Sequence, residues 1–315
     1  MNQLPNFSDI ENAHDRIRPF VHRTPVLTSQ SINRIVDAEL FFKCENLQKV
    51  GAFKFRGACN SVLALSDEEA KKGVCTHSSG NHAAALALAA RMRGIPAYIV
   101  MPENAPEIKK KAVAGYGAQI TFCEPTLPAR ESTLKKVAAE TGATEIHPYN
   151  YFNVICGQGT AAKELIEEIG QLDIVMAPVG GGGLLSGTAI SAKAMLPNVQ
   201  VIAAEPAGAD DAFRSYYSKT IQPSVAPKTI ADGLLTSLGS LTFPIILNEV
   251  DQIVTVSEEN IVAAMRMVWE RMKIIIEPSS AVPLAAILEN KVAVKGKKVG
   301  IILSGGNVDL GKLPF

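Results

Sequence analysis

The chain has 315 residues, 47% of them hydrophobic, and its 31 basic residues balance its 31 acidic ones. This length allows roughly two domains with a sizeable core, and the neutral balance argues against a broad basic face for nucleic acid or a polybasic membrane patch. No apolar stretch approaches the roughly 20 residues of a membrane helix, so we expect neither nucleic acid nor a membrane as partner.

The first half of the chain alternates short β-like segments with helical ones. Apolar runs predict strands over residues 39–45, 73–78, 96–101 and 118–123. Composition and spacing predict helices over residues 56–65, 82–93, 107–114 and 129–140. Gly94 directly follows the alanine-rich helix 82–93, a position typical of a helix C-cap.

The second half continues the same alternation. Strands are predicted over residues 173–179, 199–205 and 297–304, and helices over residues 159–169 and 258–272. A further helix is predicted to begin near Leu184, after a glycine run. Such alternation predicts an α/β fold with parallel sheets covered by helices. The irregular stretch 220–244 is either a loop over a site or a surface excursion.

Three turns that follow predicted strands carry unusual residues. They are THSSGNH at 76–82, VGGGG at 179–183 and LSGGN at 303–307. Ligands of open parallel sheets bind beyond the carboxyl ends of the strands, so these turns are the places to look for chemistry.

The glycine run Gly180, Gly181, Gly182 and Gly183 lies between a strand and a helix. Backbone amides of such a turn, together with the positive end of the helix, form a cradle for an anion such as phosphate. Neither the dinucleotide fingerprint nor the P-loop fits, because Leu185, Ser186 and Thr188 occupy the decisive positions. A tight turn that needs small residues is the alternative.

Lys54 lies between Phe53 and Phe55 in the stretch KVGAFKFRG. Desolvation of an amine lowers its pKa, and a neutral amine is a nucleophile that condenses with aldehydes. Pyridoxal 5′-phosphate is the aldehyde cofactor that also carries a phosphate, so binding of this one cofactor would account for both Lys54 and the glycine run. The alternative is a surface lysine whose neighbours point inward.

Two further residues fit the ring of that cofactor. Ser304, after the last strand, offers a hydroxyl to the pyridine nitrogen, and Asn81 offers an amide to the phenolic oxygen. Each has a simpler alternative role as a helix or turn cap.

Seven motifs appear in one order along the chain: FKFRG, THSSGNH, VGGGG, IADG, WERMK, EPSSA and LSGGN. With them the sequence resembles fold-type II pyridoxal-phosphate enzymes, in the branch of serine racemase and the serine/threonine dehydratases, over nearly its whole length. The resemblance implies two open parallel-sheet domains, as in tryptophan synthase β, with the cofactor in the cleft between them. It assigns residues 1–68 and 152–315 to a large domain and 73–150 to a small one, and it implies a homodimer.

The resemblance also implies roles for individual residues. Lys54 would bind the cofactor covalently, Phe53 would pack beside the ring, Asn81 would bond its hydroxyl, and Ser304 would meet its nitrogen. Gly180, Gly181, Gly182 and Gly183 would hold the phosphate. The substrate carboxylate would be bound by Ser78, Ser79, Gly80 and Asn81.

The reaction implied is elimination of water from serine or threonine, giving a 2-oxoacid and ammonia, together with serine racemisation. Lys54 and Ser79 would be the two bases on opposite faces of the cofactor. Arg130 resembles an arginine that reaches the substrate, which makes 3-hydroxyaspartate a further candidate substrate; its alternative role is on a solvated helix face. A sulfhydrylase fits the SSGNH loop poorly, and a non-catalytic cofactor-binding sensor remains a third interpretation.

A divalent cation site is implied by AEPAGADDA at 204–212. Glu205, Asp211 and the carbonyl of Ala209 match the family's site, and such oxygen ligands suit Mg²⁺, Ca²⁺ or Mn²⁺. The alternative is that Asp210 or Asp211 caps the following helix.

Three features limit the resemblance or bear on location. Val50, Ala52 and the alanines after His82 depart from the eukaryotic racemases, so ATP activation is not expected. The chain stops soon after LSGGN, which argues against a regulatory domain controlled by isoleucine. The N-terminal residues do not form a secretory signal, and five scattered cysteines without a CxxC pair fit reduced thiols, so we expect a cytoplasmic protein.

Overall fold

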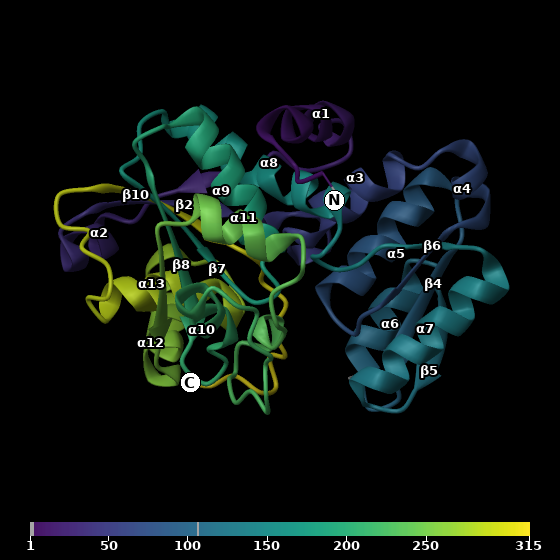
Figure 1. Ribbon diagram of the computed structural model, residues 1–315. Coiled ribbons are helices and arrows are strands. Elements are labelled where there is room, and N and C mark those ends of the chain that lie inside the picture. Colours follow the sequence, from purple (N-terminus) through teal and green to yellow (C-terminus); the bar gives the residue numbers. More distant parts are fainter. Residues whose placement is uncertain (1–2, 106) are drawn as a thin grey trace.

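The computed structural model describes residues 3–105 and 107–315, and it contains two separate sheets (Figure 1). The larger sheet has six strands in the spatial order β1 (Val26–Leu27), β2 (Glu39–Cys44), β10 (Lys298–Leu303), β7 (Ile174–Pro178), β8 (Gln200–Pro206) and β9 (Gln252–Val256). All neighbours are parallel except β1, which runs antiparallel to β2 at the edge.

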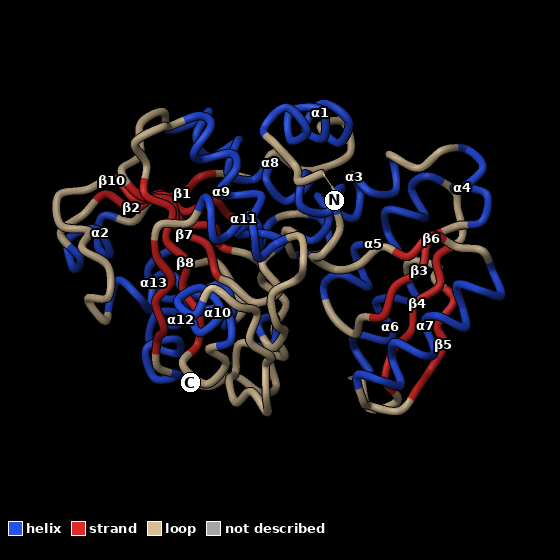
Figure 2. Tube along the Cα trace, in the orientation of Figure 1, coloured by secondary structure: helices blue, strands red, loops and turns tan. Residues whose placement is uncertain are grey.

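The smaller sheet is wholly parallel and lies apart from the larger one in Figure 2. Its order is β5 (Gln119–Cys123), β4 (Ala97–Pro102), β3 (Val74–His77) and β6 (Thr144–Glu145). Its helices are α4 (Asp67–Lys72), α5 (Asn81–Arg93), α6 (Glu107–Gly115) and α7 (Leu127–Thr141). Alternate residues of β3 and β4 pack against α5 and against α7, so these two helices cover opposite faces.

Helices also cover both faces of the larger sheet. Alternate residues of β7, β8 and β10 pack on one side against α12 (Glu258–Met272) and α13 (Pro278–Leu288), and on the other against α8 (Phe152–Ile169) and α9 (Gly183–Met195). The remaining helices of this part are α1 (Phe7–Ile17), α2 (Gln30–Val36), α3 (Lys54–Leu63), α10 (Asp211–Ser218) and α11 (Thr242–Glu249). Short 3₁₀ turns cover Glu45–Leu47, Lys49–Gly51 and Asp232–Leu234.

The predicted α/β class with parallel sheets is confirmed. Each predicted strand is present within about two residues of its expected ends, and helix α12 has the predicted bounds. Strands β1, β6 and β9 and six helices, α1, α2, α4, α10, α11 and α13, were not predicted from the sequence.

Helix α8 begins at Phe152, seven residues before its predicted start at Gly159. The glycines of ICGQG lower the helical propensity of this first part. Tertiary packing requires one of them, because a Cβ on Gly157 would lie 2.6 Å from the carbonyl oxygen of Arg56 in α3. The close approach of α3 and α8 therefore overrides local propensity.

The irregular stretch 220–244 lies against the glycine run, so it covers part of a candidate site. A Cβ on Gly180 would be 2.9 Å from the Cα of Leu234. The stretch is also tied down at Gly233, whose amide donates to Ser279 Oγ over 3.1 Å.

Candidate active site

Three neighbouring strands of the larger sheet bring Lys54 together with two of the predicted turns, VGGGG and LSGGN. Strand β10 pairs with β2 on one side and β7 on the other, with Leu303 opposite Cys44 and Ile301 opposite Met176. Because these strands are parallel, the turns that carry Lys54, Ser304 and the glycine run all leave from the same edge.

Lys54 is the first residue of α3, and its side chain points toward the loop that follows β6. Its Nζ donates to the carbonyl oxygen of Pro148 over 2.9 Å and lies 5.1 Å from the ring centroid of Phe53. Burial lowers the pKa of Lys54 to about 8, against an opposing effect of the Glu277 charge. This amine is therefore far easier to deprotonate than an ordinary lysine, as the sequence predicted.

Ser304 is buried at the end of β10, directly beside the Lys54 turn. Its carbonyl oxygen accepts from the Phe53 amide over 2.9 Å, and its hydroxyl lies 3.0 Å from Ser280 Oγ. The Ser280 hydroxyl is also 2.7 Å from both the amide and the carbonyl oxygen of Gly305. Ser280 thus fixes the position of the hydroxyl predicted to meet the pyridine nitrogen.

The four glycines are buried, and side chains at these positions would collide with their neighbours. A Cβ on Gly181 would be 2.4 Å from the Tyr149 ring, and one on Gly183 would be 2.9 Å from Tyr149 Cβ. Gly182 has a φ of +88° and begins α9 as its N-cap. Among the described residues, no acceptor takes a hydrogen bond from the amides of Gly180, Gly181 or Gly182. Orphaned amides at a helix N-terminus fit a phosphate.

The SSGN turn joins β3 to α5 and brings its residues from the smaller sheet. The Gly80 amide lies 3.3 Å from Ser78 Oγ, and a Cβ on Gly80 would meet nothing within 4 Å. Ser79 is half-buried, and its hydroxyl has no hydrogen-bond partner within the described part of the chain. This turn leaves open space and a free hydroxyl, which suits a small ligand.

Asn81 begins α5 and is bonded to Glu277, a residue that the sequence analysis did not single out. Asn81 Nδ2 donates to Glu277 Oε1 and Oε2 over 3.2 and 3.1 Å. Glu277 is buried at the N-cap of α13, and burial raises its pKa to about 7. The simpler prediction that Asn81 caps α5 is wrong, since Gly80 occupies the N-cap position and the Asn81 amide bonds to a different element.

Arg130 lies in the first turn of α7, and its side chain makes no hydrogen bond or ion pair with another described residue. Its Nε is nevertheless buried. Burial and then the charge of Arg130 lower the pKa of His77 at the end of β3. The His77 ring is in turn 6.4 Å from that of His147, which directly precedes Pro148. Arg130 therefore places a positive charge toward the end of β3, where the charge of Glu131 opposes it.

The predicted cation ligands lie at the end of β8. Glu205 is fully buried and accepts from the amides of Ala212 and Phe213 over 3.0 and 2.8 Å, whereas Asp210 occupies the N-cap position of α10 without a side-chain cap hydrogen bond. Burial raises the pKa of Glu205 to about 9 and that of Asp211 to about 6. Neither carboxylate oxygen of Asp211 has a hydrogen bond, and the Ser224 hydroxyl nearby donates to Leu235.

This environment fits a hard cation, because two carboxyl groups are buried together and burial disfavours the ionised form of both. Asp210, by contrast, forms an ion pair with Arg214 over 2.8 Å, so its charge is already paired. Within residues 3–105 and 107–315 no three His, Cys, Asp or Glu side chains cluster as a metal site, and the predicted set has only two side-chain ligands.

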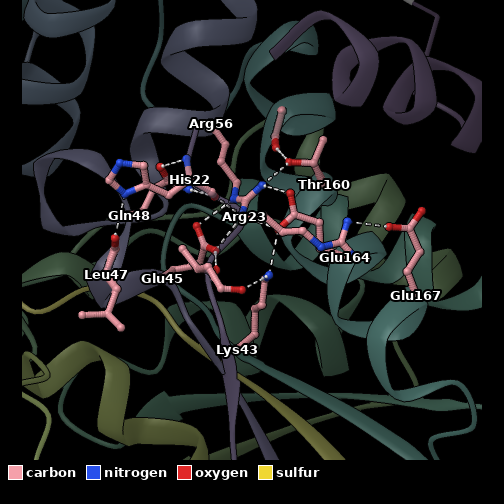
Figure 3. Close-up of polar contacts among 12 residues, drawn as sticks. His22, Arg23, Lys43, Glu45, Leu47, Gln48, Arg56, Thr160, Glu164 and Glu167 are labelled. Atoms are coloured by element: carbon pink, nitrogen blue, oxygen red, sulfur yellow. Dashed lines mark hydrogen bonds and ion pairs between the residues drawn. The ribbon is translucent and has the colours of Figure 1, made fainter. Parts of the chain in front are cut away.

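Four buried charges lie beneath the start of α3 (Figure 3). Arg56, two residues after Lys54, makes paired hydrogen bonds of 2.7–2.8 Å with Glu45 and with Glu164 of α8. Lys43 of β2 donates to the same Glu164 over 2.7 Å. Two cations and two anions balance, so the network ties the helix that carries Lys54 to β2 and α8.

Comparison with known proteins agrees with this geometry. Residues 17–305 match the family described as pyridoxal-phosphate dependent enzyme. The chain belongs to this family. The predicted resemblance and the expectation of an enzyme are confirmed. Within the family it is 54% identical over 312 residues to the beta-hydroxyaspartate dehydratase of Paracoccus denitrificans, with 99% of both chains covered.

Serine racemases are equally similar to this pyridoxal-phosphate dependent enzyme. The serine racemase of Dictyostelium discoideum is 55% identical over 309 residues, covering 97% of this chain and 95% of that protein. The crystal structure of the Dictyostelium serine racemase aligns with a TM-score of 0.94, covering 97% of this chain and 99% of the other. The sequence identity of the chain to a serine racemase is therefore about the same as its identity to a hydroxyaspartate dehydratase.

Sequence analysis missed Glu277, Ser280 and Asn307, which hold the predicted residues in place. Two of them lie in EPSSA and one in LSGGN, motifs in which only Ser304 was assigned a role. A signal was present for Glu277, because a lone carboxylate directly follows the apolar run III. Burying a lone charge beside an apolar run costs free energy, so a carboxylate in this place indicates a functional role.

Proposed function

We propose that this pyridoxal-phosphate dependent enzyme eliminates water from L-serine or L-threonine, releasing a 2-oxoacid and ammonia, and also racemises serine. The observation that carries the proposal is the Lys54 amine, whose lowered pKa makes it a base near neutral pH. The names of the racemase and dehydratase relatives support the same chemistry.

When bound, the cofactor supplies the electron withdrawal that acidifies the substrate Cα proton. Lys54 would take this proton on one face. The Ser79 hydroxyl, which has no partner among the described residues, would hold or deliver a proton on the other face. The orphaned amides of Gly180, Gly181 and Gly182 would bind the cofactor's phosphate, Phe53 would pack beside its ring, and Ser304 would bond its ring nitrogen.

The remaining substrate contacts follow from the SSGN turn. Ser78, Gly80 and Asn81 surround the open space at the start of α5, and the helix N-terminus favours an anion there. We infer that the substrate carboxylate is bound at this turn, so that Cα lies between Lys54 and Ser79.

A second substrate is favoured by Arg130. A positive charge without a partner, directed toward the end of β3, suits the extra carboxylate of threo-3-hydroxyaspartate. The relative from Paracoccus denitrificans is named for such a substrate. We therefore propose 3-hydroxyaspartate as an alternative substrate of the same elimination.

The cation and the assembly complete the proposal. Glu205, Asp211 and the Ala209 carbonyl would hold Mg²⁺, Ca²⁺ or Mn²⁺, which would stabilise the fold at the end of β8.

We also propose a cytoplasmic homodimer with a small domain of residues 73–150 that closes on the large domain, 1–68 and 152–315. None of the helices in the described part of the chain is long and apolar enough to span a bilayer.

The first experiment tests the cofactor. Purified protein given pyridoxal phosphate should show a visible absorption band that Lys54→Ala abolishes, while Lys49→Ala, on the same turn, keeps it. A protein that never develops the band would refute the proposed function.

The second experiment tests the substrate and the two bases. L-serine, D-serine, L-threonine and threo-3-hydroxyaspartate are each assayed for oxoacid and for the opposite enantiomer. Ser79→Ala should reduce racemisation about 100-fold or more while elimination from the L-isomer falls much less, since only racemisation needs the second base. Ser132→Ala, a serine on the exposed side of α7, serves as the control. Equal loss of both reactions in Ser79→Ala would contradict the two-base assignment.

Arg130→Met separates the two substrate proposals. It should lower kcat/KM for threo-3-hydroxyaspartate by about 100-fold, as expected for a lost charge-assisted hydrogen bond, and change L-serine little. An equal effect on both substrates would refute the role of Arg130 in binding a second carboxylate.

A further inference from the structure

Asn307 lies on an exposed turn after β10, yet both of its nitrogen donors make hydrogen bonds. Its Nδ2 donates to the Val50 carbonyl over 2.7 Å and to Asn81 Oδ1 over 2.9 Å. Its backbone amide donates to Glu277 Oε2 over 3.2 Å. With the Asn81–Glu277 bonds already described, Asn81, Glu277 and Asn307 form a closed ring of hydrogen bonds, here called the amide ring.

The amide ring has only one consistent arrangement of donors. The Val50 carbonyl can only accept, so it must face the Asn307 NH₂ group; the same NH₂ then meets the Asn81 oxygen. Asn81 therefore turns its NH₂ toward Glu277 and its oxygen toward Asn307, and Asn307 turns its NH₂ toward Val50 and Asn81. Both side-chain amides, which could otherwise flip, are fixed by the acceptors at the two ends.

Fixing the Asn81 amide matters for a ligand. One N–H of Asn81 can serve both Glu277 oxygens, which are 3.1 and 3.2 Å away, and the second N–H then remains for another acceptor. A flipped amide would present its oxygen in that place. An oxygen there would repel an anionic phenolate that the N–H would stabilise.

The same side chain holds a strained turn just before Lys54. Val50 has a φ of +56°, a strained conformation for a β-branched residue. Gly51 follows with a φ of +69°, and a Cβ there would be 2.7 Å from Asn307 Oδ1. Such strain persists only where surrounding bonds hold it, and the Asn307–Val50 bond is one of these.

The amide ring also joins parts of the chain that belong to different sheets. Asn81 begins α5 of the smaller sheet, whereas Glu277 and Asn307 belong to α13 and the turn after β10. Asn307 therefore connects the turn that carries Lys54 with the SSGN turn across the site.

We propose that Asn307 is a positioning residue, which fixes the Asn81 amide with an N–H toward the phenolic oxygen of pyridoxal phosphate. This inference rests on the proposed function, because it assumes that the cofactor binds between Lys54 and Asn81. Asn307 touches neither cofactor nor substrate and acts through Asn81.

The test uses the full-length protein loaded with pyridoxal phosphate and follows the visible band against pH. Asn307→Asp keeps the shape of the side chain and replaces its donor by an acceptor. A donor to the phenolic oxygen favours the deprotonated form of the bound cofactor, so misplacing it should raise the pH of the band's titration by about one unit. Asn198→Asp, the same change at an exposed asparagine without side-chain hydrogen bonds, should leave the titration unchanged.

A second background shows whether the effect passes through Asn81. In Asn81→Ala protein, adding Asn307→Asp should move the titration no further. The proposal would be overturned if Asn307→Asp shifted the titration in the Asn81→Ala protein as much as it does in the wild type. It would also be overturned if Asn307→Asp and Asn198→Asp proteins titrated at the same pH. Asn307→Ser, which also removes Nδ2, gives the same readout should the aspartate variant fail to fold.

The two possible failures are distinguishable. A wild-type protein without any visible band refutes the proposed function itself. A wild-type protein that shows the band, with a titration unmoved by Asn307→Asp, refutes only the role of Asn307. Thermal unfolding of the cofactor-free variants shows whether an altered titration merely reflects a loss of fold.

Discussion

Lys54 shows how one residue's surroundings set its chemistry. Burial lowers its pKa to about 8, so in the cofactor-free protein the neutral amine increases about tenfold per pH unit below that value. We predict that the rate of covalent pyridoxal phosphate uptake rises by this factor from pH 6 to pH 7 and levels off above pH 8. Stopped-flow absorbance of the visible band measures it.

Control experiments for this prediction use the same assay. Lys54→Ala should show no band at any pH, although reversible binding of the phosphate to the glycine amides is retained. A rate that rises unchanged up to pH 10 would mean that Lys54 titrates as an exposed lysine, and would remove the physical basis for its role.

Asp211 supports a second prediction at the residue scale. Its carboxylate is buried without a hydrogen bond, so Mg²⁺ should raise the unfolding temperature of the wild-type protein and have no effect on Asp211→Asn. Without Mg²⁺, Asp211→Asn should itself be more stable than the wild type by about 1–3 kcal/mol, because a buried carboxylate without a hydrogen-bond partner among the described residues is replaced by a neutral side chain. Differential scanning calorimetry with and without EDTA measures both effects.

The neighbouring aspartate provides the control. Asp210 pairs with Arg214, and Asp210→Asn should retain the response to Mg²⁺. Loss of the response in Asp210→Asn but not in Asp211→Asn would contradict the assignment of ligands.

Helix α3 holds Lys54 in place because Arg56, in the same first turn, is bonded to other elements. Glu164 of α8 balances Arg56 and Lys43 in a fully buried network (Figure 3). We predict that Glu164→Gln lowers the free energy of unfolding by about 3–5 kcal/mol, since it leaves buried charge unpaired. Urea denaturation measures the effect, and Glu140→Gln, in the exposed pair with Lys136, should change stability by less than about 0.5 kcal/mol.

The pH dependence of this stabilisation follows from the Glu164 carboxyl. Burial alone would raise its pKa, but hydrogen bonds and charges of Arg56 and Lys43 lower it to about 2. The unfolded carboxyl takes up its proton near its usual pKa of about 4.5, so the contribution is complete above that pH and is lost as the pH falls toward 2. A Glu164→Gln penalty that persists unchanged at pH 2 would contradict this account.

Elements that carry their own local signal were predictable from the sequence. Strand β7 is a continuous apolar run, helix α12 has apolar residues at helical spacing, and Ser304 and the glycine run follow strands directly. The amide ring was not predictable, because its members come from residues 81, 277 and 307 and meet only through the order of the strands. The early start of α8 was missed for the same reason, since contact with α3 decides it.

The whole molecule places its site between two sheets, and α3 of the larger part packs against α5 of the smaller sheet in a shared hydrophobic cluster. Lys54, Ser304 and the glycine run come from the larger sheet, whereas Ser79 and Asn81 come from the smaller one. A cofactor that contacts both would stabilise the folded state of both and couple their unfolding. Without it, the smaller sheet is held to the rest by the packing of α3 against α5, by the amide ring and by the Lys109–Asp232 ion pair.

We predict that cofactor-free protein unfolds in two steps and that the loaded protein unfolds in one. The single tryptophan, Trp269, lies in α12 of the larger part and reports only on that part, while far-UV circular dichroism reports on all helices. In urea, the two signals should therefore separate for cofactor-free protein, with the dichroism changing first, and coincide after loading. Lys54→Ala should keep the separation even with excess pyridoxal phosphate if covalent attachment is what joins the halves. Coincident curves for the cofactor-free protein would show that the two sheets already fold as one unit, and the site would then gain its rigidity from the chain alone.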